Sequence, residues 1–154
     1  MATAPSTTTA LAQTWCNLSV LHDRIGERVG RSLEAEHDLS VREYSLLTVL
    51  HRHHKGKVDR FQMREVADAI VLSQSATTRL VTRLEDRGLL ARTICADDRR
   101  GICTKITEAG RELFEAARPT HDAALREALD EAGKDPELQP LVEALERIGE
   151  RRAA

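Results

Sequence analysis

The sequence predicts a mainly α-helical protein of one domain with a small β-hairpin. Its length of 154 residues lies within the usual range of a single domain. Apolar residues recur at spacings of three and four over most of the chain, which is the period of an amphipathic helix. Only 3% of the residues are aromatic, so the core must consist of Leu, Val, Ile and Ala, a composition typical of helical proteins.

The composition also excludes several classes of protein. With 41% hydrophobic and 31% charged residues and no long apolar run, the chain is neither disordered nor membrane-spanning. The scarcity of aromatic rings argues against a single-strand binder that stacks bases. Residues 1–10 lack the basic start and apolar core of a signal peptide, so we expect a mobile tail there, a cytoplasmic location, and one domain over residues 11–154.

The first predicted helix runs from Leu11 to Leu33. Its apolar residues continue at helical spacing through the whole segment when His22 is included in the row. One small lobe cannot cover so long an apolar stripe. We therefore expect part of this helix to pack on the C-terminal helices or on a second chain.

A second helix is predicted over residues 41–53. Ser40 and Glu43 have the spacing of a capping box, in which each side chain accepts a hydrogen bond from the backbone of the other. Leu39 and Tyr44 occupy the two positions of a hydrophobic staple. These four residues place the start of the helix.

Two shorter helices follow. After a charged loop over residues 53–60 and a short strand near Phe61, residues 63–70 have helical spacing. Ser73 is a suitable N-cap for a helix over residues 74–87. The inward row expected for this helix consists of Ala76, Leu80 and Leu84.

A β-hairpin and two long helices complete the prediction. Segments 89–96 and 102–107 are rich in β-compatible residues and flank a charged turn. A long helix then extends from residue 108 to about Ala132. The pair Asp135-Pro136 resembles an N-cap followed by proline at the first helical position, which predicts a last helix over 136–150.

A short helix, a turn, a second helix and a charged hairpin form a winged helix-turn-helix, whose second helix enters the major groove of DNA. Residues 60–105 carry a net charge of +3, while the rest of the chain carries −5. The outward face of helix 74–87 offers hydroxyl groups and arginine, which suit close approach to DNA and contacts to bases and phosphates. The candidate DNA-binding residues in and before this helix are Arg60, Ser73, Gln74, Ser75, Thr77, Thr78, Arg79, Thr82 and Arg83.

The sequence resembles the MarR family of bacterial transcription regulators. The resemblance is carried by LSQSATTRLVTRLEDRGLLAR at 72–92, DDRRG at 97–101 and ITEAG at 106–110. The order of predicted helices agrees with the family over nearly the whole chain. The central motif is specific, whereas the flanking helices match only in pattern.

The resemblance implies a homodimer that binds a pseudo-palindromic operator. It assigns residues 11–37 and 108–152 to dimerisation helices and residues 40–107 to a DNA-binding lobe. The family's hairpin, the wing, carries an Asp-x-Arg element whose arginine enters the minor groove; Asp98 and Arg100 match it, with Arg99 between them. We expect a repressor without catalytic activity, whose partners are double-stranded DNA and a second copy of itself.

Members of the family commonly release DNA when a small, often aromatic or phenolic molecule binds. Trp15 and His22 lie near the place where such a cleft is expected. A tryptophan on an apolar stripe also fits a core position, and His22 also fits a hydrogen-bonded residue of a helix seam. The sequence does not identify the effector.

Cys16 resembles the reactive cysteine of the branch of the family that senses organic hydroperoxides. That branch supports its cysteine with tyrosines, whereas the matching positions here hold Val20, Gly30 and Val41. Without those hydroxyl groups nothing evident activates the thiol. Thiol-based redox sensing through Cys16 is therefore an alternative function, and a buried, inert cysteine is the simpler expectation.

Cys95 and Cys103 fall opposite each other when the hairpin is folded about Arg99. Cross-strand Cβ atoms are roughly 4.5–5.5 Å apart, slightly beyond the usual spacing of a disulfide. We expect two small, reduced residues on one strand face, which remain redox candidates.

Other chemistry finds little support. The histidines of HRHHKGK (51–57) have no cysteine or carboxylate at a companion spacing, so neither a metal nor a cofactor is expected. No nucleophile with a base and an oxyanion site is evident, which argues against an enzyme. A winged helix that binds only protein remains the second alternative, although the basic hairpin and hydroxyl-rich helix face do not favour it.

Overall fold

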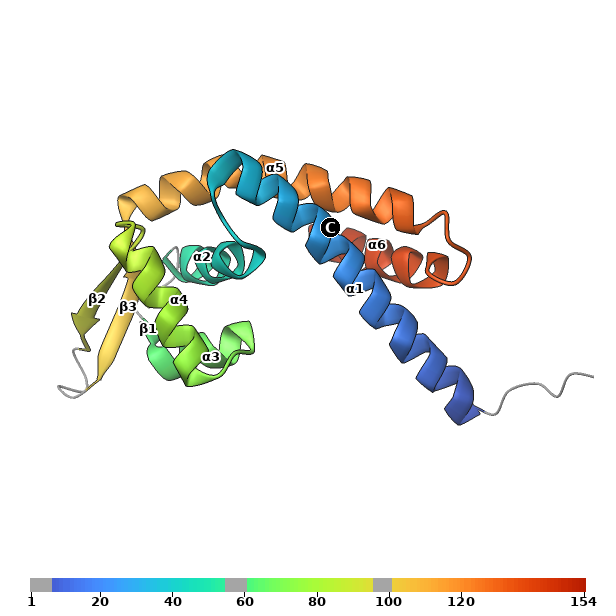
Figure 1. The fold of residues 1–154 in the computed structure, drawn as a ribbon, viewed down its shortest axis with the longest axis horizontal. Coiled ribbons are helices and arrows are strands. Elements are labelled where there is room, and N and C mark those ends of the chain that lie inside the picture. Colours follow the sequence, from blue (N-terminus) through green and yellow to red (C-terminus); the bar gives the residue numbers. More distant parts are fainter. Residues whose placement is uncertain (1–6, 55–60, 96–100) are drawn as a thin grey trace, which may run out of the picture. The chain divides into compact units, whose positions relative to one another are not determined.

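The computed structural model describes residues 7–54, 61–95 and 101–154, and it confirms a mainly helical fold with a small antiparallel sheet (Figure 1). The chain divides into two compact units, one of residues 33–120 and one of residues 1–32 with 121–154. The elements are α1 (Thr7–His37), α2 (Val41–His54), β1 (Phe61–Gln62), α3 (Met63–Ile70), α4 (Gln74–Asp86), β2 (Leu90–Ile94), β3 (Ile102–Ile106), α5 (Glu108–Ala132) and α6 (Gln139–Ala153).

The unit of residues 33–120 contains α2, α3, α4 and the sheet, whose strand order is β1-β3-β2. Both strand pairs are antiparallel, and the predicted short strand at Phe61 pairs with Thr104. Helices α2 and α3 contact β3, and α4 contacts β2. The core between them is aliphatic, as the composition requires, and includes the fully buried Leu47, Val66 and Val81.

The predicted capping box is present at the start of α2. The Ser40 amide donates to Glu43 Oε2 at 2.8 Å, and the Glu43 amide donates to Ser40 Oγ at 3.1 Å. The turn before it passes through Asp38, which has a positive φ of 52°. Leu39 and Tyr44, the predicted staple, are both buried.

The other unit consists of the first part of α1, the end of α5, and α6. Its core cluster is Leu21, Leu129, Ala132, Leu138 and Val142. The expected row through His22 is wrong, because the His22 side chain is 80% exposed and pairs with Asp23. Leu21, one residue earlier and about 100° away around the helix, takes that place in the row and lies eight residues before the buried Val29, which was predicted correctly.

Two predicted boundaries also require correction. Helix α1 begins at Thr7, so residues 7–10 are helical and do not belong to a tail. Asp135 does not cap α6; its carbonyl and carboxylate accept hydrogen bonds within a separate turn, and α6 begins at Gln139, with Pro140 in its first turn. None of the helices over the described residues is long and apolar enough to cross a membrane.

Candidate nucleic-acid interface

Helix α4 has two chemically distinct faces. Ser73 caps it as predicted, accepting a hydrogen bond from the Ala76 amide at 3.3 Å. Leu80 and Leu84 of the expected inward row are buried, whereas Ala76 is half-buried. The exposed residues of α4 that the sequence assigned to DNA binding are Gln74, Ser75, Thr78, Arg79, Thr82 and Arg83.

Thr77 does not belong to the exposed face. Its side chain is fully buried, and its hydroxyl group donates to the Ser73 carbonyl at 2.9 Å. The candidate assignment of Thr77 to DNA binding is therefore wrong. Thr78, the next residue, also donates to a backbone carbonyl, that of Gln74, but it lies on the solvent side.

Thr82 is held by a residue that the sequence did not single out. Arg92 of β2 donates a hydrogen bond to the Thr82 hydroxyl, and Arg92 Nε pairs with Glu85 at 2.6 Å. This contact ties the middle of α4 to the hairpin. Thr82 is therefore both exposed and oriented by the neighbouring strand.

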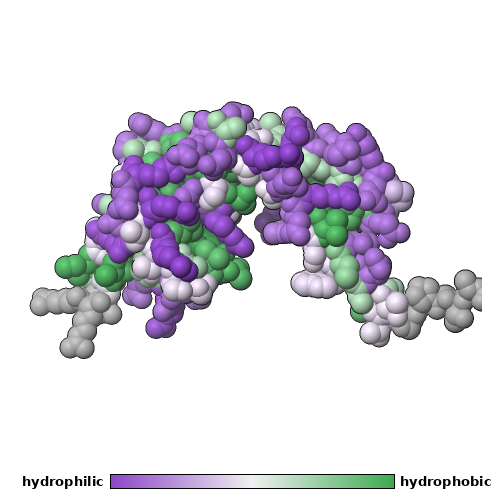
Figure 2. Space-filling view, in the orientation of Figure 1, coloured by the Kyte–Doolittle hydropathy of each residue, from purple (hydrophilic) through white to green (hydrophobic). Residues whose placement is uncertain are grey.

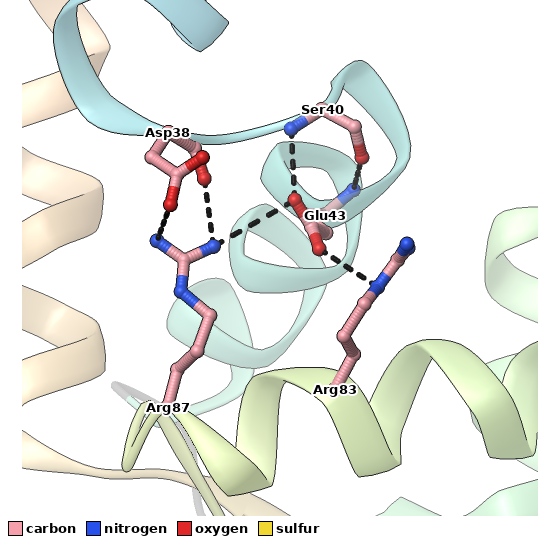
Figure 3. Close-up of polar contacts among 5 residues, drawn as sticks. All are labelled: Asp38, Ser40, Glu43, Arg83 and Arg87. Carbon is pink, nitrogen blue, oxygen red and sulfur yellow. Dashed lines mark hydrogen bonds and ion pairs between the residues drawn. The ribbon is translucent and has the colours of Figure 1, made fainter.

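Figure 3 shows a second connection, between α4 and the start of α2. The Glu43 carboxylate is buried; Arg83 Nε lies 3.2 Å from its Oε1, and Arg87 Nη1 lies 3.8 Å from its Oε2. Arg87 also donates to the Asp38 carbonyl at 2.7 Å and lies 3.7 Å from the Asp38 carboxylate. The two arginines pair with two acidic residues, so the buried charge of Glu43 is compensated.

Sequence reasoning recognised Glu43 only as a cap and overlooked Arg42 beside it. Arg42 is exposed on α2 and donates to the Ile70 carbonyl at 3.2 Å. It lines a groove together with Leu72, Ala76, Arg79, Leu80 and Arg83. The basic charge of residue 42 was available in the sequence, but its position beside α4 depends on the packing of α2.

The structure corrects the expectation for the hairpin cysteines. Cys95 and Cys103 form a disulfide with a Cα–Cα distance of 5.3 Å. Cys103 faces Thr93 in the strand register, not Cys95, whose amide bonds to the Gly101 carbonyl beyond the end of β2. The chain therefore does not fold symmetrically about Arg99, and the pair meets diagonally at the end of the ladder.

Several candidate residues fall elsewhere. Arg60, Asp98, Arg99 and Arg100 lie outside the described residues. Trp15, 68% exposed, lies in the other unit, as does the exposed His22. Cys16 also lies there; the expectation that it is buried is wrong, because it is exposed, and it forms no disulfide.

The similarity to known proteins covers most of the chain. The sequence pattern of the MarR family matches residues 37–101. The HTH-type transcriptional regulator MhqR of Bacillus subtilis (strain 168) is 29% identical over 132 residues, which cover 86% of each chain.

Two solved structures share the fold. Sco3205, a MarR family transcriptional regulator from Streptomyces coelicolor solved in complex with DNA, has a TM-score of 0.72 at 24% identity and covers 96% of this chain and 89% of its own. CouR from Rhodococcus jostii RHA1, bound to p-coumaroyl-CoA, has a TM-score of 0.63 at 30% identity and covers 85% of each chain. The matched segment begins at the end of α1 and includes α4, and the relatives extend over the flanking helices. The chain belongs to the MarR family of winged helix-turn-helix transcriptional regulators.

Proposed function

We propose that the protein is a homodimeric, sequence-specific DNA-binding repressor that a small molecule releases from its operator, with no catalytic activity of its own. The observation that carries this proposal is the division of α4 into a buried aliphatic face and an exposed face of hydroxyl groups and arginines. Short hydroxyl side chains are weak helix formers, so their clustering on an exposed helix needs another reason. Contact with the edges of bases in a major groove supplies it.

The proposed readers of DNA are the exposed candidates of α4, with Ser73 at its start. We also include Asp98, Arg99 and Arg100 of the wing and Arg60 before β1. Their inclusion rests on the sequence pattern alone. The solved DNA complex of the similar Sco3205 supports this use of the fold. Arg87 is left out, because both acidic partners engage its guanidinium.

The proposed dimer rests on exposed apolar side chains of α1 and α6. Figure 2 shows hydrophobic surface on this part of the molecule. These residues belong to the unit formed by the two chain ends, and a second copy that covers them would remove them from water. They are Leu11, Trp15, Leu18, Val20, Leu145 and Ile148.

The proposed effector is an aromatic small molecule. CouR, 30% identical to this chain, was solved with p-coumaroyl-CoA, an aromatic acyl thioester. Trp15 and His22 are the candidate contacts on α1, since a broad ring and an imidazole suit an aromatic ligand; because Trp15 also belongs to the proposed dimer surface, the effector would bind at the edge of that surface. The test is release of a bound operator by p-coumaroyl-CoA, with free coenzyme A as the control; retention of DNA with a wide panel of aromatic compounds would contradict this part.

The decisive experiment for DNA binding is footprinting of genomic fragments, beginning with the region upstream of the protein's own gene. A dimer should protect two half-sites about one helical turn apart. Protection should weaken steeply with salt, because arginine contacts to phosphates release counterions. The absence of protection on every fragment at low salt would refute the proposal and favour a module that binds only protein.

A further inference from the structure

A groove beside α4 is lined by apolar and basic side chains. The apolar ones are Leu72, Ala76 and Leu80, and the basic ones are three arginines, Arg42 of α2 and Arg79 and Arg83 of α4. Within the described part of the chain, no carboxylate forms an ion pair with Arg42 or Arg79. The groove therefore presents uncompensated positive charge beside the exposed face of α4.

Another hollow, in the other unit, shows that this is not a general property of the surface. Its walls also hold three arginines, but Glu127, Asp130 and Glu131 line it too. Arg28 pairs there with Glu127. That hollow is balanced in charge, whereas the groove beside α4 is basic.

Glu43 lies behind one wall of the groove and fixes its arginine. Its Oε1 forms an ion pair with Arg83 Nε. Its Oε2 accepts a hydrogen bond from the Ser40 amide and lies near Arg87. The Arg83 side chain nevertheless remains 65% exposed. Figure 3 shows its outer nitrogen directed away from Glu43. The buried carboxylate thus holds the guanidinium by its inner edge and leaves the outer edge for a ligand.

We propose that Arg42 and Arg83 clamp a phosphate of the DNA backbone in this groove, and that Glu43 is the positioning residue that orients Arg83. This rests on the proposed function, because it needs α4 in a major groove. A helix in that groove has a sugar-phosphate strand on either side, and the wing can serve only one of them. The groove beside α4 would contact the other strand. That contact would fix how deeply and at what angle α4 lies in the major groove, without distinguishing base sequence.

The first test compares Arg42→Gln with Arg52→Gln, a matched control at the exposed far end of the same helix. Affinity for an operator duplex and for a random duplex is measured by fluorescence anisotropy over a range of salt concentrations. For a dimer, Arg42→Gln should weaken both complexes by a similar factor, roughly tenfold or more, and reduce the slope of log affinity against log salt by about 2. Arg42→Lys keeps the charge and should restore the slope.

The second test is a double-mutant cycle between Glu43→Gln and Arg83→Ala. Glutamine keeps an oxygen that can accept the Ser40 amide, so the cap survives while the charge is lost. If Glu43 acts through Arg83, Glu43→Gln should lower DNA affinity in the wild-type background. It should cause no further loss in a protein that already carries Arg83→Ala. A purely structural glutamate would lower the melting temperature and have the same effect on DNA affinity in both backgrounds.

The outcomes separate the two proposals. Wild-type protein that binds neither duplex overturns both the proposed function and the clamp. If the wild type binds DNA and Arg42→Gln has the same affinity as Arg52→Gln, the clamp alone is overturned. The same holds if Arg42→Gln loses affinity and Arg42→Lys does not restore it. If the Arg42 variants do not fold, the cycle decides: multiplicative losses overturn the role of Glu43, and complete coupling supports it.

Discussion

Thr77 and Thr78 are identical residues at adjacent positions, yet their surroundings are opposite. Thr77 is fully buried and Thr78 is exposed, although both hydroxyl groups donate to the carbonyl four residues earlier. A threonine hydroxyl satisfied in this way is tolerated inside a helix and inside a core. Residue type alone therefore does not distinguish a DNA contact from a packing residue.

Arg79 and Leu80 are a second adjacent pair and give a test of the two faces of α4. Leu80→Ala should lower the free energy of unfolding by about 2–5 kcal/mol, because Leu80 is buried and its truncation leaves a cavity. Arg79→Ala should change stability by no more than about 0.5 kcal/mol and reduce discrimination between operator and random DNA, by about 1–3 kcal/mol if Arg79 makes a bidentate base contact. Chemical denaturation and competition binding measure the two effects. An Arg79→Ala variant with the wild-type preference would exclude Arg79 as a reader of bases.

The hairpin disulfide can be tested by counting thiols. Protein denatured without reductant should show one reactive thiol, that of Cys16, and reduced protein should show three. Cys103→Ser should lower the free energy of unfolding under oxidising conditions by about 2 kcal/mol, because the bond closes a short loop. Three reactive thiols before reduction would contradict the bond.

At the scale of elements, the start of α5 approaches the backbone before β2 closely. A Cβ atom added to Gly110, in the ITEAG motif, would lie 2.2 Å from the Leu89 carbonyl oxygen and 2.8 Å from an Ile106 side-chain carbon. Thr107 reinforces the junction: its hydroxyl donates to the Gly88 carbonyl at 2.7 Å and accepts the Gly110 amide at 3.1 Å. The start of α5 therefore packs against the hairpin so closely that position 110 has no room for a side chain.

Two glycine substitutions test this junction. Gly110→Ala should destabilise the protein by at least about 1–3 kcal/mol, because the contacted carbonyl belongs to the backbone and cannot simply rotate away. Gly149→Ala, in α6, meets nothing within 4 Å and should stabilise the helix by up to about 1 kcal/mol. Thermal unfolding of the two variants gives the comparison. Equal effects would mean that α5 adjusts its position freely against the hairpin.

At the scale of the whole molecule, the unit formed by the two chain ends has a small core and a large exposed apolar surface. Leu138 and Val142 belong to that core, so deletion of the last helix would damage the unit itself as well as any dimer. A substitution on the exposed surface is the cleaner probe of assembly. Trp15 is suitable because it is 68% exposed and outside the core cluster.

Trp15→Glu should convert the proposed dimer to a monomer without unfolding the chain, since the charge would be buried without a partner in a dimer and solvated in a monomer. Val71→Glu is the control, because Val71 is also an exposed apolar residue but lies in the other unit, between α3 and α4. Sedimentation velocity with circular dichroism measures both. A wild-type monomer, or a Trp15→Glu dimer as stable as wild type, would count against assembly through this surface.

Local sequence patterns correctly predicted the order of elements, the capping box at Ser40, the cap at Ser73 and the short strand at Phe61. These features depend on residues within one or two turns of each other, so periodicity and capping chemistry suffice to predict them. The exposed face of α4 was predicted for the same reason, except at its edge, where Thr77 lies about 100° from Thr78 around the helix. The MarR family was recognisable from the motif that spans this helix and the hairpin.

Contacts between residues far apart in the sequence could not be predicted and depend on how the elements pack. The contacts of Glu43 with Arg83 and Arg87 join residues about 40 positions apart, and the groove wall at Arg42 exists only because α2 packs beside α4. The diagonal pairing of Cys95 with Cys103 depends on the strand register, which the number of residues in the turn does not specify. Such contacts arise from the packing of whole elements, whose energy is shared among many side chains, so no local pattern in the sequence records them.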